Sequence, residues 1–188
     1  MANSQTGGKT WGVPFQRSTV VMYYNKDLFK EAGLDPNKAP QNWKELSEAA
    51  QKLTKKDASG KGTQYGIQIP STGFAYWMLQ TLTTPNGVLL ANETGTKVTF
   101  DHPKVIEALE YWVNLTKQGV HPAGVVEWGT TPKDFFEKKA AIMVTTTGNL
   151  TNVRKNAQFD FGVGQIAGNL RKGSPTGGGN FYIFKKAP

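Results

Sequence analysis

Cysteine is absent from the 188-residue chain, and histidine occurs only twice. The lack of cysteine excludes disulfides, thiolate nucleophiles and cysteine-based metal sites. Apolar runs are also short, and none approaches the roughly 20 residues that a membrane-spanning helix needs. The N-terminus is small and polar, without the basic and then apolar layout of a secretory signal. We therefore expect either a cytosolic protein or one whose signal is missing from this sequence.

Motifs for catalysis are missing as well. His102 and His121 each precede a proline, which is typical of a helix entry and a turn rather than of a catalytic base. The sequence contains no Gly-x-Ser-x-Gly elbow, no His-Glu-x-x-His pair and no paired carboxylates of the glycosidase type. We expect no catalytic residue, no metal site and no cofactor. The absence of a matched nucleophile and base also argues against a hydrolase.

The net charge of +8 raises one alternative of a different class, a basic nucleic-acid-binding module. The lysines, however, are dispersed along the chain. Pairs such as Lys55-Lys56 and Lys138-Lys139 are far apart and flanked by ordinary core segments. This distribution favours solvated helix faces over a nucleic-acid surface, and no nucleic-acid partner is expected.

The rest of the sequence alternates strands with helices, which predicts one α/β domain with a mixed sheet flanked by helices. The expected strands, rich in β-branched and aromatic residues, are 11–15, 20–24, 65–69, 140–145, 159–166 and 181–184. The expected helices, with apolar residues at helical spacing, are 27–32, 43–56, 74–82, 103–118, 131–138 and 149–156. Asn42 and Glu45 form a capping-box pattern, and Lys55 and Lys56 are placed in the last turn of that helix. The glycine-rich stretch 173–179 is predicted to be a loop.

Three polar or aromatic groups stand at predicted strand ends and helix starts. Thr145–Asn149 lies between a strand and a helix, where ligands of open α/β sheets bind. Arg17-Ser18-Thr19 joins two strands, and Phe74, Tyr76 and Trp77 offer an aromatic platform for a sugar ring or a glycerol backbone. Helix capping, a surface hairpin and a core position for Trp77 are the structural alternatives to these binding roles.

Several segments, in order, resemble a known family. Pro14–Leu34 (PFQRSTVVMYYNKDLFKEAGL) is followed by Pro40–Leu46 (PQNWKEL), Phe136–Met143 (FEKKAAIM) and Gly177–Phe181 (GGGNF). Together they resemble the extracellular solute-binding proteins of ABC transporters. Gly148–Arg154 and Phe161–Gly164 look most like the glycerol-3-phosphate-binding branch.

The resemblance implies a two-lobed protein that is considerably longer than this chain. Residues 1–188 would then form one lobe of type II periplasmic-binding-protein-like fold, truncated at both ends. The implied function is the solute-binding component of an ABC importer, which captures a sugar or a glycerol-3-phosphate-like solute for a membrane permease. The implied location is periplasmic or extracellular, with a lipoprotein anchor as one alternative.

Carried over by position, the resemblance implies ligand contacts from a small set of residues: Ser18 or Thr19, Trp77, Thr146 or Thr147, and Gly178. Arg17 departs from the glycerol-3-phosphate branch, which has a small polar residue there, and the threonine run replaces a serine-rich one. Both departures leave the solute open. A face that meets a second lobe is expected to be apolar and open, which predicts self-association through Tyr76, Trp77 and Phe181.

Overall fold

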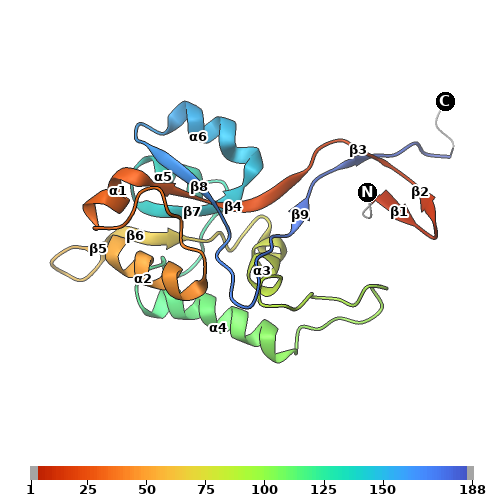
Figure 1. The fold of residues 1–188 in the computed structure, drawn as a ribbon, viewed down its shortest axis with the longest axis horizontal. Helices are drawn as coiled ribbons and strands as arrows, with labels where there is room; N and C mark the ends of the chain where they lie inside the picture. Colours follow the sequence, from red (N-terminus) through yellow and green to blue (C-terminus); the bar gives the residue numbers. More distant parts are fainter. Residues whose placement is uncertain (1–3, 186–188) are drawn as a thin grey trace.

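A computed structural model describes residues 4–185 and shows a mixed sheet with helices on both faces, from which a narrow ribbon extends to one side (Figure 1). The sheet follows the order β5-β6-β7-β4-β8, and β9 pairs with the first residues of β4. β6 and β7 run parallel, whereas the other described pairs in this sheet are antiparallel. The predicted α/β class with a mixed sheet is therefore confirmed.

The elements have the following bounds. The strands of the sheet are β4 (Ser18–Asn25), β5 (Lys55–Lys56), β6 (Gly62–Gln68), β7 (Ala140–Thr146), β8 (Phe161–Gln165) and β9 (Thr176–Gly177). The ribbon contains β1 (Gln5–Thr6) paired with β2 (Lys9–Thr10), and β3 (Val13–Pro14) paired with β10 (Asn180–Phe181). The helices are α1 (Lys26–Glu31), α2 (Trp43–Leu53), α3 (Ala75–Thr83), α4 (Pro103–Lys117), α5 (Thr131–Phe136) and α6 (Leu150–Asn156), with a 3₁₀ turn, η2 (Thr147–Asn149), before α6.

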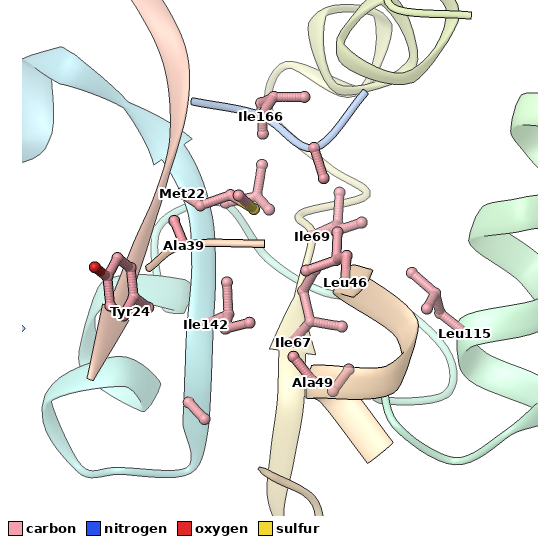
Figure 2. Close-up of a cluster of buried hydrophobic side chains, with 14 of the residues drawn as sticks. Met22, Tyr24, Ala39, Leu46, Ala49, Ile67, Ile69, Leu115, Ile142 and Ile166 are labelled. Atoms are coloured by element: carbon pink, nitrogen blue, oxygen red, sulfur yellow. The ribbon is translucent and has the colours of Figure 1, made fainter. Parts of the chain in front are cut away.

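β4 and β7 form the centre of the sheet because both are apolar on both faces. Val20, Met22 and Tyr24 point into the larger core, which α1, α2, α3 and α4 complete (Figure 2). Val21 and Tyr23 point to the other face, where α5 and α6 contribute the buried Phe135 and Val153. Alternate residues of one strand thus separate two cores.

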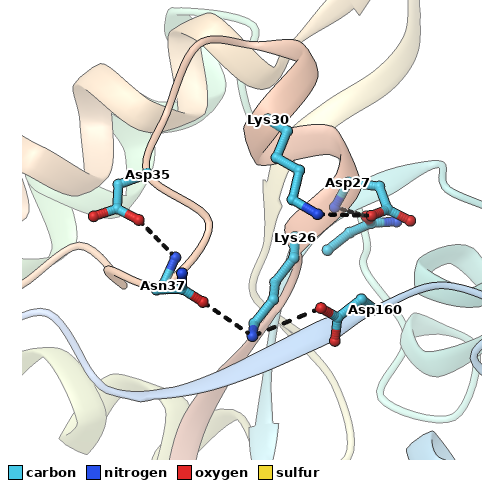
Figure 3. A network of polar contacts seen from close by, with 7 residues as sticks. Lys26, Asp27, Lys30, Asp35, Asn37 and Asp160 are labelled. Atoms are coloured by element: carbon cyan, nitrogen blue, oxygen red, sulfur yellow. Dashed lines mark hydrogen bonds and ion pairs between the residues drawn. The ribbon is translucent and has the colours of Figure 1, made fainter.

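The Asn25 end of β4 is fixed by polar contacts (Figure 3). Asn25 caps α1 by accepting hydrogen bonds from the backbone N–H groups of Asp27 and Leu28. Lys26 lies 3.7 Å from the carboxylate of Asp160 and donates to the side chain of Asn37 at 3.3 Å. Such exposed ion pairs contribute little individually, but these contacts join α1 to the segments before α2 and β8.

The predicted cap of the second helix is confirmed, whereas its predicted end is wrong. The side chain of Asn42 accepts a hydrogen bond from Glu45 N at 2.9 Å. The helix stops at Leu53 because Thr54 turns to an extended conformation, and its hydroxyl accepts from Gly66 N at 3.0 Å. Lys55 and Lys56 therefore pair with β6 as β5 instead of continuing α2.

Other boundaries near the ribbon also differ from the prediction. Of the predicted strand 181–184, only Phe181 belongs to β10, and Tyr182, Ile183 and Phe184 are exposed. Of 11–15, only Val13 and Pro14 are paired. The predicted loop 173–179 contains β9. No described helix is both long and apolar enough to cross a membrane.

Candidate ligand-binding site

Segments far apart in sequence meet at one rim of the sheet. β4 runs antiparallel to β7, with Val20 beside Thr146, so the start of β4 lies next to the carboxyl end of β7. β9 then pairs with Ser18 and Thr19. The predicted position of the threonine run at a strand's carboxyl end is therefore confirmed.

A cavity of about 470 Å³ opens at this rim. Its lining combines backbone-rich glycine segments, hydroxyls and an aromatic wall. The lining residues are Gln16, Arg17, Ser18, Phe74, Tyr76, Trp77, Trp128, Thr146, Gly148, Gly177, Gly178 and Gly179. Ser18, Trp77, Thr146 and Gly178 are thus brought together from four segments of the chain.

Thr19 and Thr147 occupy different positions. Thr19 donates to Pro175 O at 3.2 Å and lines a separate cavity of about 360 Å³. Thr147 places its hydroxyl 3.1 Å from that of Ser18 and accepts from Thr19 N at 3.3 Å. Thr147 therefore joins β4 to the turn before α6, whereas Ser18 and Thr146 are the members of the two predicted alternatives that line the 470 Å³ cavity.

Trp77 has two roles in the cavity wall. Its ring lines the cavity, and its contacts hold neighbouring segments in place. The indole is half-buried and packs on the larger core, and its Nε1 donates to Pro175 O at 3.2 Å. The ring also lies against Gly177, where a Cβ would come within 2.6 Å of Trp77 Cζ2. Trp77 therefore packs against the core and also lines the cavity, so it combines the two predicted positions.

Trp128 completes the wall, and the sequence analysis missed it. Its ring meets Phe74 edge-on with 5.1 Å between centroids, and its backbone N–H donates to Thr72 Oγ1 at 3.3 Å. Ser71 exchanges further hydrogen bonds with Val126 at 2.8 and 2.9 Å. These contacts clasp the loop before α3 to the loop before α5 and hold Trp128 over the cavity.

His121 also helps to hold the loop that carries Trp128 in place. It is 3% exposed, and its Nδ1 and Nε2 lie 2.8 Å from Pro122 O and 3.1 Å from Ile69 N. Burial lowers the pKa of His121, although its contacts with the carbonyls of Ile69 and Pro122 oppose that shift. The neutral imidazole therefore links the end of β6 to the loop that carries Trp128, and the predicted turn residue is part of the core.

The hydroxyl groups at the rim differ in their availability. Ser18 Oγ already accepts from Gly148 N at 3.2 Å. Thr146 is 8% exposed, and no hydrogen bond to its hydroxyl occurs within residues 4–185. Beneath it, Tyr23 donates to Thr146 O at 3.1 Å, and burial raises the pKa of Tyr23 to about 12. Tyr23 therefore stays protonated and fixes the backbone while the hydroxyl of Thr146 can meet a ligand.

Among the described residues that line the cavity, Arg17 alone is charged, and its guanidinium forms hydrogen bonds within the protein. Arg17 donates to the carbonyls of Gln16 and Gly179 at 3.0 Å each, and also to the side chain of Asn180. These bonds connect the segment before β4 to the segment before β10. Arg17 thus joins the two segments of the ribbon, and the rest of the described lining is uncharged and largely aromatic, as sites for organic ligands often are.

A larger cavity of about 550 Å³ lies elsewhere and shares no lining residue with this one. Several of its charged groups already have partners in the protein. Lys139 pairs with Glu137 at 2.7 Å, and Asp134 accepts from Gln68 at 2.9 Å. Because these partners satisfy much of its polar lining, the aromatic rim cavity is the better candidate.

Comparison with known proteins identifies the family to which the chain is similar. The family model described as bacterial extracellular solute-binding protein matches residues 1–188. The sn-glycerol-3-phosphate-binding periplasmic protein UgpB of Pectobacterium atrosepticum is 32% identical over 180 residues, covering 91% of this chain and 39% of that protein. The chain therefore spans well under half the length of this curated relative.

Solved structures give the same result. The ABC substrate-binding protein Lmo0181 of Listeria monocytogenes, in complex with cycloalternan, is 28% identical with a TM-score of 0.81, covering 98% of this chain and 46% of that one. UgpB from Mycobacterium tuberculosis, in complex with glycerophosphocholine, is 25% identical with a TM-score of 0.83, covering 99% and 45%. The type II periplasmic-binding-protein-like fold is confirmed, and these relatives give no support to the nucleic-acid-binding alternative.

Proposed function

This chain belongs to the family of bacterial extracellular solute-binding proteins, and from this premise we propose that it forms one lobe of the solute-binding component of an ABC importer. The observation that carries the proposal is the convergence of Ser18, Trp77, Thr146 and Gly178 on one aromatic cavity. The share of the relatives' length that the chain covers supports a single lobe.

The solute that fits this cavity best is a neutral, polyhydroxylated one. Aromatic faces cover the apolar faces of sugar rings, and the hydroxyl of Thr146 can donate to and accept from sugar hydroxyls. A phosphate would need a cation, but the one cation of the lining, Arg17, is held by carbonyls and Asn180. We therefore favour a sugar over glycerol-3-phosphate. Because the relatives include UgpB proteins, glycerophosphate compounds are also tested below.

The remaining parts of the proposal follow from the family. The protein would act outside the cytoplasm, free in the periplasm or held by a lipid anchor, and would deliver its solute to a membrane permease. It would not be an enzyme, since the described residues that line the cavity include no carboxylate, histidine or other base that could accept a proton.

Titration calorimetry on the full-length protein tests the ligand class. The panel comprises mono-, di- and trisaccharides, glycerol-3-phosphate and glycerophosphocholine. Trp77→Ala should weaken binding of the successful ligand at least about tenfold, equivalent to about 1.4 kcal/mol. Trp77→Phe keeps an aromatic surface but loses the bond to Pro175, and so separates stacking from support. If only phosphorylated compounds bind, the sugar assignment is wrong.

The isolated 188 residues should bind the same ligand much more weakly than the full-length protein. A two-lobed protein divides its contacts between the lobes, and losing half of a micromolar affinity of about −8 kcal/mol leaves roughly millimolar binding. Micromolar binding by this chain alone would contradict the single-lobe proposal.

Self-association through the cavity face is a separate part of the proposal. Tyr76 and Phe181 are 63% and 60% exposed, and Trp77 is half-buried. Light scattering over a range of concentrations measures it directly, and a strict monomer would reject it.

A further inference from the structure

The rim cavity has a neighbour on the other side of the sheet. The 470 Å³ cavity, called here the first compartment, lies on the side of α3. A second compartment of about 290 Å³ is lined by Trp128, Gly129, Pro132, Thr145, Thr146, Gly148 and Asn149. Trp128, Thr146 and Gly148 line both compartments, so the two adjoin over the carboxyl end of β7.

The strand explains how one groove reaches both faces. Thr145 and Thr146 are consecutive residues of β7 and therefore point to opposite faces of the sheet. Thr146 lines both compartments, whereas Thr145 lines only the second. A ligand that crosses the end of β7 would therefore meet one hydroxyl on each side.

Both threonines are largely buried, but their hydroxyls remain accessible and have no hydrogen-bond partner in the described part of the chain. Thr145 is 4% exposed and Thr146 is 8% exposed. Within the described part of the chain, neither side-chain hydroxyl makes a hydrogen bond, and the Nδ2 group of Asn149 likewise makes none. These polar groups are not enclosed by protein atoms, so a molecule in the two compartments could form hydrogen bonds with them on both sides of the strand.

Trp128 is fixed at the junction of the compartments. Gly73, with φ of 73°, brings its backbone so close that a Cβ would lie 2.8 Å from Trp128 Cβ. Phe74 supports the indole edge-on, and within residues 4–185 the indole N–H donates to no other group. A fixed aromatic residue with a free donor suits the link between two sugar rings.

We propose that the ligand is a saccharide of at least two linked rings, one in each compartment, and that Trp128 determines this length specificity. The inference rests on the proposed function and adds the size of the ligand. None of the described residues that line the second compartment is charged, which supports a neutral second ring.

The test measures affinity against chain length in the full-length protein. Calorimetry uses D-glucose, maltose and maltotriose, and D-mannose, mannobiose and mannotriose. In the series that binds, the di- or trisaccharide should bind at least about tenfold more tightly than the monosaccharide, equivalent to about 1.4 kcal/mol. Equal affinity for all lengths overturns the two-ring inference and leaves the proposed sugar function standing. Absence of binding by every saccharide overturns both.

Two variants probe the second compartment in different ways. Trp128→Ala should reduce the length preference to less than about threefold. Gly129→Leu adds a bulky side chain at a lining position of the second compartment, where a Cβ meets nothing within 4 Å. Gly129→Leu should remove the length preference while the packing of Trp128 on Phe74 is kept. The test therefore remains valid if Trp128→Ala fails to fold.

Val125→Ala is the matched control because Val125 lies in the same loop, is 69% exposed and lines neither compartment. It should retain the full length preference. If Gly129→Leu retains that preference as well, the second compartment holds no ring and the inference is wrong.

Discussion

Gly178 offers the sharpest test of the rim geometry, because its neighbour Gly179 provides a matched control. Gly178 has φ of 140°, and a Cβ there would lie 2.0 Å from Gln16 O and 2.9 Å from Gln16 C. At Gly179 a Cβ would meet nothing within 4 Å. Gly178→Ala should therefore force the segment after β9 away from the segment before β4, whereas Gly179→Ala should not.

The magnitude follows from two costs. An L-residue in such a backbone conformation costs about 1–3 kcal/mol. Forcing a methyl group into filled space costs about 1–3 kcal/mol more. The chain can limit this cost by separating locally, so we expect about 2 kcal/mol, or a factor of about 30. Gly179→Ala should be neutral or slightly stabilising, because alanine reduces the freedom of the unfolded chain.

Amide hydrogen exchange is the appropriate assay because it reports local separation. The amides of Phe15 and Gln16 donate to Gly179 O at 3.0 and 3.4 Å, directly across the proposed break. In Gly178→Ala these two amides should exchange about 30-fold faster, while amides of β7 keep their protection. Unchanged exchange at Phe15 and Gln16, or the same change in both variants, would refute the close approach at Gly178.

Two further predictions concern stability. Because burial lowers the pKa of His121 below its ordinary 6.5, the unfolded chain binds the proton more tightly, and stability should fall as the pH drops below about 6.5. Urea unfolding between pH 7.5 and 5.5 should show a slope of at most about 1.4 kcal/mol per pH unit, which His121→Gln should remove; an unchanged slope in that variant would contradict the assignment. Phe135→Ala should cost about 3–5 kcal/mol in the same assay, since Phe135 is fully buried in the smaller core, and a loss below 1 kcal/mol would show that this core is loosely packed.

Elements fixed by local signals could be predicted from the sequence. Asn42 and Glu45 cap α2 within one turn, and His102 accepts from Lys104 N at 3.1 Å at the start of α4. The apolar runs of β4 and β7 have a length and composition that favour a buried strand in any surroundings. Such elements need no information from distant residues.

Elements that depend on a distant partner could not be predicted in the same way. β5 and β9 are two-residue strands that exist because β6 and β4 pair with them. Ile183 and Phe184 have strand-like composition but remain 93% and 81% exposed, because no described strand pairs with them. Composition predicts which residues can pair, whereas the fold decides which do.

The candidate site shows both situations. Alternation along β4 could have separated Ser18 from Thr19, since consecutive residues of a strand face opposite ways. Trp128 had no such signal, because its position depends on hydrogen bonds that Val126 N and Trp128 N donate to Ser71 and Thr72, more than 50 residues earlier. Hydrogen bonds between two polar loops produce no periodic pattern of apolar residues from which they could be predicted.

Different parts of this chain are expected to determine its stability and its ligand specificity. The Asn25 end of β4 is fixed by the α1 cap and by the contacts of Lys26 and Asp160, while the Ser18 end meets glycine segments and clasped loops. Changes in the cores between these ends should therefore alter the free energy of unfolding with little effect on ligand choice. Changes in the loop that carries Trp128 and Gly129 should do the reverse, because that loop contributes few buried side chains but borders both compartments. Solutes of different length could thus be accommodated by changing this loop while β4 and β7 stay the same.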